Sequence, residues 1–357
     1  MNCSIELLSI DDVDRNEWNR LTNHASMPYY INQEFEYARI MSSSHDIPLF
    51  LLIRDKTGLL VSGIVFYSSS MKLGQVLTSN GGPVLAEDSA NSLQEGLNQF
   101  SRIYSKKFLN IRLAFIPPYN FLGKDSSFKA VSPAMTSIID LSGTMQEVEK
   151  KVDRSRRVRI KKAIQSDIQV KELKTWGEWN KSYELQLFHG KTKKYPLYYG
   201  RENWRDIYDA YSETGKRITL GAFSDKDMIG TIGITNIKGR ATMDVLADLP
   251  NVANVSSLLM YRAIEYSKRH SANSFNLSGL PSKKSHLNGI RSFKQSYGGD
   301  EVPIYEFCSN KIFSSLFEIM RNDSFSNLIN NMATSFHLDR LLWTAKSSVS
   351  QMPIQKE

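Results

Sequence analysis

Cysteine is scarce in this sequence: the 357 residues contain two, Cys3 and Cys308, far apart in the chain. Two distant cysteines lack the spacing of a metal site, and a secreted domain held by disulfides would need more of them. The first residues include several acidic side chains and no apolar run of signal-peptide length. Together these absences predict a protein of the reducing cytoplasm.

Long apolar runs and several catalytic signatures are missing as well. No window approaches the roughly 18 uncharged apolar residues that a membrane-spanning helix needs. The sequence has no G-x-S-x-G elbow, no H-E-x-x-H or C-x-x-C, and no Walker or G-x-G-x-x-G loop. Hydrolases with a serine elbow, zinc peptidases and dinucleotide-binding enzymes are therefore not indicated.

The composition of the chain indicates an ordered globular protein with excess positive charge. Hydrophobic residues make up 41% and aromatic residues 11% of the sequence, and the formal net charge is +8. The length suffices for about two domains, each with its own core. Such a charge favours an anionic partner: a phosphate, a nucleic acid or an acidic lipid surface.

One order of elements, a β-hairpin, a strand, a helix and a strand, occurs twice in the chain. In the first half the apolar patterns predict strands at 49–53, 59–67, 76–85 and 109–116, with a helix at 89–106. In the second half they predict strands at 218–223, 228–235, 241–247 and 274–279, with a helix at 255–270. We therefore expect an α/β (α+β) fold with two copies of one unit.

The predicted domains are 1–137, 138–310 and a C-terminal extension, 311–357. Apolar residues at helical spacing predict two amphipathic helices in that extension. Burial against the second domain is the ordinary interpretation of these helices, and attachment to a membrane surface is the minority one.

The stretch 273–299, NSFNLSGLPSKKSHLNGIRSFKQSYGG, carries the most specific pattern in the chain. A short strand is followed by a polar loop and then by a segment that, as a helix, places Phe293, Lys294 and Tyr297 close together. Gly298 and Gly299 end it, as expected of a helix C-terminus. A cation beside two aromatic rings at the end of a buried strand suits the stabilisation of negative charge. A loop without a function is the alternative.

Basic side chains gather in two further segments. Residues 150–162 carry eight basic side chains and one acidic one. Two interpretations have about equal weight: a solvated helix face, and a surface that contacts phosphate or RNA. Residues 188–199, FHGKTKKYPLYY, mix lysines with tyrosines, as in a flap over an anionic substrate that bears a ring. An exposed loop whose tyrosines pack downward would show the same pattern.

One aspartate and two histidines lie outside any recognisable motif and are also candidate site residues. Asp244 lies midway along a predicted core strand, so it is either a group of a binding cleft or half of a structural ion pair. His189 and His286 are single histidines in predicted loops, where solvent exposure is the more common state.

The second hairpin, strand and helix resemble the core of the GNAT acetyltransferases. In that fold the turn before the long helix normally carries a Gln/Arg-x-x-Gly-x-Gly/Ala run whose backbone N–H groups hold the coenzyme A pyrophosphate. Here the turn is 248–254, DLPNVAN, which contains no glycine. Without glycine the backbone cannot easily approach a pyrophosphate, which counts against acetyl-CoA as the donor.

The duplicated layout, the R-x-R-I-K-K-A run at 157–163 and the G-I-x-S-F-K-x-x-Y-G-G run at 289–299 together resemble the Fem-type aminoacyltransferases and their acetyltransferase relatives. The resemblance spans about 32–306. It implies two tandem GNAT-like domains, each a mixed, mostly antiparallel sheet flanked by helices. It also implies transfer of an amino acid from aminoacyl-tRNA to the peptide stem of a peptidoglycan precursor. The long charged coiled-coil insertion of some members, which serves tRNA, is missing.

The resemblance also implies roles for residues of the second domain. Lys294 would stabilise the oxyanion of the transition state or the tRNA end, and Phe293 would shape the acceptor pocket. Independently of the resemblance, the chemistry of amide formation needs a base for the amine, for which Asp244, a water or the substrate itself are the candidates. Basic residues around the cleft would hold the diphosphate of a nucleotide-linked or lipid-linked acceptor. The remaining candidates for substrate binding are Tyr297, Arg291, Lys191, Lys194, Tyr199, Phe35 and Arg39.

No bound cofactor or metal is expected; the donor, aminoacyl-tRNA or acyl-CoA, is a substrate. Two alternatives stay open. One is an acyl-CoA-dependent N-acyltransferase acting on an amino sugar or a surface polysaccharide. The other is a non-catalytic protein that binds RNA or an anionic envelope lipid through 150–162.

Overall fold

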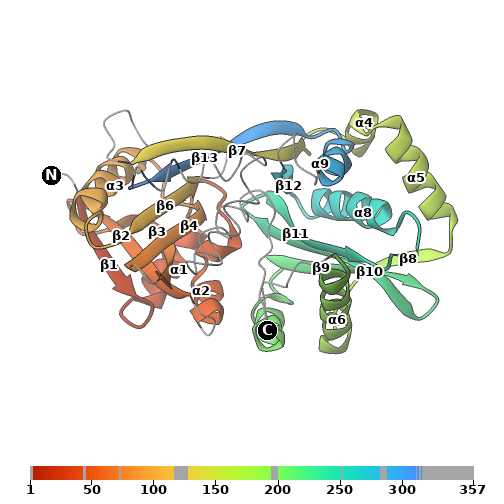
Figure 1. The fold of residues 1–357 in the computed structure, drawn as a ribbon, viewed down its shortest axis with the longest axis horizontal. Helices are drawn as coiled ribbons and strands as arrows, with labels where there is room; N and C mark the ends of the chain where they lie inside the picture. The colour runs from red at the N-terminus through yellow and green to blue at the C-terminus, as the bar shows by residue number, and fades with distance from the viewer. Residues whose placement is uncertain are drawn as a thin grey trace. The chain divides into compact units, whose positions relative to one another are not determined.

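The computed structural model describes residues 3–42, 46–71, 74–115, 128–193, 200–250, 252–281 and 288–310, with the single positions 312 and 315 (Figure 1). Contacts divide these residues into two units: 3–134 together with 303–310, and 135–302. The predicted C-terminal helices at 311–357 thus fall almost wholly outside the described residues.

The first unit is built around a mostly antiparallel sheet. Its strands are β1 (Cys3–Ser9), β2 (Ile47–Asp55), β3 (Leu60–Met71), β4 (Gly74–Gly82), β5 (Val84–Leu85), β6 (Asn110–Phe115) and the second half of β13 (Asp300–Cys308). They follow the order β1-β2-β3-β4-β6-β13, β5 pairs with β3, and the β4–β6 pair is parallel. The predicted hairpin is confirmed as β2–β3.

Helices of the first unit begin and end where the local chemistry indicates. They are α1 (Arg15–Asn23), the 3-10 helix η1 (Ile31–Gln33), α2 (Phe35–Ser42) and α3 (Ala90–Tyr104). Asp14 caps α1, because its carboxylate accepts a hydrogen bond from the backbone N–H of Asn16 at 2.8 Å. The helix predicted at 89–106 is confirmed as α3, in which Leu93, Leu97 and Phe100 are buried in the core, whereas Ile103 at the same spacing is 49% exposed.

A buried ion pair joins β13 to the first unit. Tyr305, Glu306, Phe307 and Cys308 pair antiparallel with β6. The guanidinium of Arg112 donates to Glu306 at 2.8 Å and to Asn80 Oδ1 at 3.1 Å, and both charged side chains are almost fully buried. The last strand of this unit therefore comes from the far end of the described chain.

The strands of the second unit follow the order β7-β12-β11-β10-β9-β8. The strands are β7 (Lys129–Asp140), β8 (Ile168–Glu172), β9 (Arg217–Ser224), β10 (Asp227–Ile237), β11 (Arg240–Asp248) and β12 (Ser274–Leu280). The predicted second hairpin is confirmed as β9–β10. Among the described strands of this unit, β11 and β12 pair in parallel and the other neighbours pair antiparallel.

The helices of the second unit cover both faces of its sheet. They are α4 (Met145–Lys151), α5 (Arg154–Gln165), α6 (Trp176–Lys193), α7 (Arg201–Tyr211), α8 (Val255–Arg269) and α9 (Asn288–Gln295). Figure 1 shows α8 on one face and α6 on the other. Val255, Leu259 and Ala263 bury the predicted apolar side of α8 in the core. In the part of the chain that the structure describes, no helix is long and apolar enough to cross a membrane.

Candidate active site

The parallel strands β11 and β12 separate halfway along their length. They pair at Arg240–Ser274, Ala241–Phe275 and Thr242–Asn276, and no further described pairs follow. The equivalent parallel strands of the first unit, β4 and β6, stay paired along their length. Their first pair is Val76 with Asn110 and their last is Gly82 with Phe115. An opening between two parallel strands is where the backbone of a sheet can accept a ligand, so the second unit holds the better candidate site.

Both strands carry an irregularity where they separate. In β11 the register against β10 shifts at Asp244, and in β12 the register against β7 shifts at 277–278. Ser278 has a positive φ of 63°, rare for a residue other than glycine. Its hydroxyl donates to the Met243 carbonyl at 2.5 Å, which bridges the opening at its inner end. Bulges and strained residues of this kind gather next to active sites.

Lys294 delivers a positive charge to the end of β12. It lies on α9, is 8% exposed, and its Nζ donates to the Gly279 carbonyl at 2.8 Å, one residue past Ser278. Burial lowers the pKa of the Lys294 ammonium to about 7. Among the described residues no carboxylate forms an ion pair with it. The charge is therefore available to an anionic group at this position.

The rings of Phe293 and Tyr297 form cation–π contacts with Arg156. Phe293 and Tyr297 meet edge to face at 5.4 Å, and the guanidinium of Arg156 lies over them, 4.5 Å from the first ring and 5.4 Å from the second. Tyr297 is fully buried and its hydroxyl donates to the Ser257 carbonyl at 3.2 Å. Within the described residues, the cation that lies over both rings is therefore Arg156, from α5, and a role of Phe293 in shaping the acceptor pocket stays a prediction.

Asp244, at the bulge of β11, forms an ion pair with Arg217. The Arg217 guanidinium is buried and lies 5.0 Å from the ring of Trp204 on α7. Of the two roles that the sequence allowed for an inward carboxylate, the structure shows the structural ion pair. A role for Asp244 as base stays a prediction.

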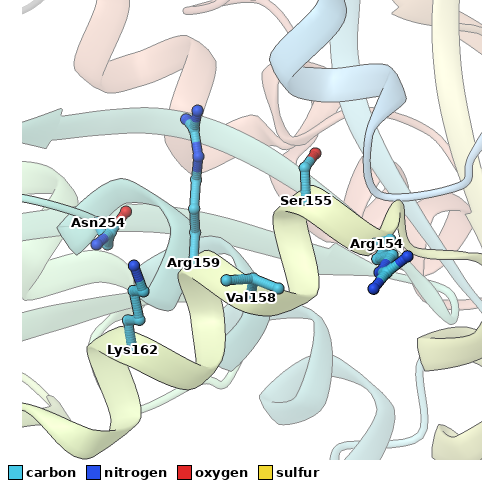
Figure 2. A pocket seen from close by; sticks show the side chains of 6 residues that line it. All are labelled: Arg154, Ser155, Val158, Arg159, Lys162 and Asn254. Carbon is cyan, nitrogen blue, oxygen red and sulfur yellow. The ribbon is translucent and has the colours of Figure 1, made fainter.

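A basic groove runs along the outer face of α5. Its volume is about 770 Å³, and Figure 2 shows the six lining residues, with Lys162 and Asn254 facing each other. They are Arg154, Ser155, Val158, Arg159, Lys162 and Asn254. Among the described residues, three cations and no acid line the groove. Three of the eight basic side chains of 150–162 thus line a concave surface suited to phosphate oxygens.

The N-terminus of α8 is filled by the protein's own side chains. The Asp248 carboxylate accepts a hydrogen bond from Ser256 in the first turn and lies 3.5 Å from Nδ1 of His189. Asn254 has a positive φ of 66°, and Val255 is fully buried. An acid at the positive end of the helix repels a second anion, so these residues do not fit a pyrophosphate on the backbone amides.

His189 itself differs from its expected setting. It lies on α6, is only partly exposed, and its Nδ1 is 3.0 Å from the Asp248 carbonyl oxygen, so it is not a histidine of an exposed loop. The other single histidine, His286, lies outside the described residues.

The other predicted substrate-binding residues are distributed over the chain. Arg291 is buried, donates to the Pro281 carbonyl at 2.7 Å and pairs with Glu301, so it holds the chain that follows β12. Lys191 is exposed in the last turn of α6, while Lys194 and Tyr199 lie outside the described residues.

Phe35 and Arg39 belong to the first unit. Phe35 is buried, with its ring 5.6 Å from that of Phe50, and Arg39 is exposed and paired with Glu36 at 2.9 Å. Their roles in substrate binding stay predictions. Nowhere in the described ranges do three or more His, Cys, Asp or Glu residues gather in an arrangement that could hold a metal ion.

Residues that sequence reasoning missed are Ser278, Arg217 and Arg156. Arg156 shares the i, i+4, i+7 spacing of Ile160 and Ala163, which are both buried, and this spacing was the one available signal that it faces inward. Neither the positive φ of Ser278 nor the position of Arg217 under Trp204 has a local sequence signal.

No protein-family model and no curated protein sequence matches this chain. Solved structures do match. A structure of FemX has a TM-score of 0.69 at 13% identity and covers 88% of this chain and 100% of its own. The C-terminal domain of a putative lysylphosphatidylglycerol synthetase from Agrobacterium fabrum has a TM-score of 0.62 at 12% identity and covers 87% and 96%.

Two further structures complete this group. L-PGS from Bacillus licheniformis has a TM-score of 0.60 at 12% identity and covers 88% of this chain and 97% of its own. A tandem GNAT protein from the clavulanic acid biosynthesis pathway has a TM-score of 0.50 at 12% identity and covers 86% and 98%. At these identities the likeness concerns the fold. The predicted architecture is confirmed: this chain consists of two GNAT-like units in tandem and has the fold of FemX.

Proposed function

We propose that this protein is an aminoacyltransferase that joins an amino acid, carried as an ester on tRNA, to an amine of a cell-envelope precursor. The observation that carries the proposal is that β12 stops pairing with β11 after Asn276 and that the buried ammonium of Lys294 donates to the carbonyl of Gly279, three residues further along β12. Supporting it are the folds of FemX and of lysylphosphatidylglycerol synthetase, whose name states an aminoacylated lipid.

The chemistry needs an oriented amine and a stabilised oxyanion. The amine nitrogen attacks the ester carbonyl carbon, and the carbonyl electron pair moves to oxygen. The Lys294 ammonium has three hydrogens, of which the Gly279 carbonyl takes one, so two are left for the oxyanion. Collapse re-forms the carbonyl and breaks the C–O ester bond. The amine loses a proton and the leaving hydroxyl gains one, so one amide and one alcohol result.

Substrate positioning and oxyanion stabilisation lower the barrier by different amounts. Holding both substrates in reactive geometry supplies up to about 7–11 kcal/mol in ideal cases. One donor aimed at the oxyanion supplies about 3–4 kcal/mol. We therefore assign most of the rate to positioning and the Lys294-dependent part to charge stabilisation.

The groove of α5 favours an RNA-borne donor over acyl-CoA. Arg154, Arg159 and Lys162 offer side-chain cations to successive phosphates, whereas Asp248 fills the helix end on which a coenzyme A pyrophosphate would rest. The acceptor is then an envelope precursor with a free amine, of the nucleotide-linked or lipid-linked diphosphate kind. A lipid-linked acceptor would bring the protein to the membrane surface.

A transfer assay tests this proposal. The purified chain is given isotope-labelled aminoacyl-tRNA or acetyl-CoA with an amine-bearing peptidoglycan precursor, and the products are examined by mass spectrometry. We expect one amino-acid increment from aminoacyl-tRNA, and a loss of about 10²–10³-fold in turnover for Lys294→Met. Unchanged turnover in Lys294→Met would overturn the mechanism. Use of acetyl-CoA alone would overturn the choice of donor.

Variants of the groove separate binding from chemistry. Arg159→Gln and Lys162→Gln should each raise the KM for the donor and lower the salt slope of RNA binding by about 1, with kcat little changed. Lys226→Gln, an exposed charge in the β9–β10 turn, is the matched control. Steep salt dependence of RNA binding with no turnover of either donor would identify a binding protein instead of an enzyme.

A further inference from the structure

Arg156 is a buried cation beneath the basic surface of α5. It is 8% exposed, whereas Ser155 and Arg157 on either side of it are exposed. Within the described residues no acid forms an ion pair with it, and burial lowers its pKa. Burying an arginine in this way is costly, so its neighbours have to supply compensating contacts.

Those contacts come from α8 and from the segment that carries Lys294. The Nε of Arg156 donates to Ser296 Oγ at 2.8 Å, and its NH1 donates to Ser257 Oγ at 2.7 Å. The central carbon of the guanidinium also lies 4.5 Å from the centroid of the Phe293 ring. One side chain of α5 thus joins α8 to residues on both sides of Lys294.

Backbone contacts also join the start of α5 to the segment that follows Lys294. The N–H of Asp153 donates to the Ser296 carbonyl at 2.9 Å. Gly298 has a positive φ of 75° and lies so close to Lys151 that a Cβ there would collide with the Lys151 carbonyl. The N-terminal end of α5 and the C-terminal end of α9 are therefore held together at several points, with Arg156 as the side chain in the middle.

We propose that Arg156 is a positioning residue: it fixes α9 against α5 and α8, and so sets how deeply the Lys294 ammonium lies at the end of β12. This inference rests on the role proposed for Lys294. It also gives α5 two functions, since its outer face lines the basic groove and its inner face holds the catalytic candidate. The donor and the reacting centre are then placed by one helix.

Arginine suits this position better than lysine does. Its guanidinium is planar, so it can donate to two hydroxyls in one plane while its face stacks on an aromatic ring. A lysine ammonium keeps the charge but cannot make both hydrogen bonds and the stacking contact together. Arg156→Lys therefore removes the positioning contacts while it keeps the charge.

The test measures how deeply Lys294 is buried and needs no turnover. A trace acetylating reagent reacts with neutral amines, so the pH dependence of Lys294 labelling in the full chain, followed by mass spectrometry, gives its titration midpoint. We expect Arg156→Lys and Ser296→Ala to raise this midpoint by about one pH unit, because a better-solvated ammonium titrates closer to the ordinary value of about 10.4. Both variants keep the charge, so loss of a positive neighbour cannot explain the shift.

Arg157→Lys is the matched control, because Arg157 is the next residue, is exposed and donates to the backbone carbonyls of Glu149 and Lys150. Its midpoint should equal that of the parent. An unchanged midpoint in Arg156→Lys and Ser296→Ala would overturn the inference. Should Arg156→Lys fail to fold, Ser296→Ala alone decides, since it removes one hydroxyl.

Kinetics separate this inference from the proposed function. In the transfer assay Arg156→Lys should lower kcat with little change in the KM for the donor, the reverse of Arg159→Gln. If the labelling midpoint shifts and no variant or parent transfers an amino acid, the positioning role of Arg156 stands and the proposed function fails.

Discussion

At the scale of single residues, the uncompensated ammonium of Lys294 makes the proposed reaction depend on pH. Burial lowers its pKa from the ordinary 10.5 to about 7, and oxyanion stabilisation needs the protonated form. We therefore expect kcat to fall as pH rises through about 7.

Lys294→Arg provides the control for this prediction, because arginine stays charged over the whole range. Any activity that it keeps should not fall between pH 7 and 9. A parent profile that rises or stays level over this range would contradict the requirement for a protonated Lys294. The measurement is kcat against pH at saturating donor.

The burial of Lys294 lowers the free energy of unfolding at pH values where the ammonium is charged, whereas an ordinary ion pair would raise it. The folded pKa of Lys294 lies below the unfolded one, so between about pH 7 and 10 the unfolded chain binds more protons and the free energy of unfolding rises with pH. Below that range the full cost of burying the charge is present.

Lys294→Met removes this cost. At pH 6 the variant should be more stable than the parent by about 1–3 kcal/mol, and the difference should shrink toward pH 9. Urea unfolding at both pH values measures it. A variant that is less stable than the parent at pH 6 would show that the ammonium has a partner that stabilises it.

At the scale of elements, the bulge of β12 lies directly after its last pair with β11. Ser278 combines a positive φ with a hydrogen bond to the Met243 carbonyl across the opening. Ser278→Ala loses the hydrogen bond and keeps the strained conformation, whereas Ser278→Gly loses the bond and relieves the strain.

Ser278→Ala should therefore be less stable than the parent by about 1–2 kcal/mol, and Ser278→Gly should recover about 1 kcal/mol of that loss. Thermal unfolding of the three chains provides the comparison. Equal stability of the alanine and glycine variants would show that φ at this residue is not positive in solution.

At the scale of the whole molecule, the last described strand belongs partly to the first unit. The last half of β13 pairs with β6, and the Arg112–Glu306 ion pair is almost fully buried. Glu306→Gln leaves the guanidinium of Arg112 in the interior without its counter-charge. We expect a loss of about 3–5 kcal/mol in the free energy of unfolding.

A fragment that ends at Ala134 checks the same point, because it lacks this strand altogether. It should unfold at lower denaturant than the full chain does, as measured by circular dichroism. A fragment as stable as the first unit of the intact protein would show that β13 adds little to that unit.

Local patterns predicted many of the elements. Alternating apolar residues located the hairpins β2–β3 and β9–β10, and helical spacing located α3 and α8, because these periodicities report which side of an element is buried. The predicted basic helix was accurate in composition, but the structure divides it at Val152 and Asp153, and one of its cations points inward.

The sequence by itself determined the two repeated units, the fold resemblance and the strand–loop–helix stretch with Lys294. Only the tertiary structure decided that β11 and β12 separate, that Arg156 rather than Lys294 lies over the rings of Phe293 and Tyr297, and that β13 completes the first unit. Periodicity describes a residue and its near neighbours. A buried polar side chain finds its partner across the fold, as Arg156 does 140 positions away in Ser296.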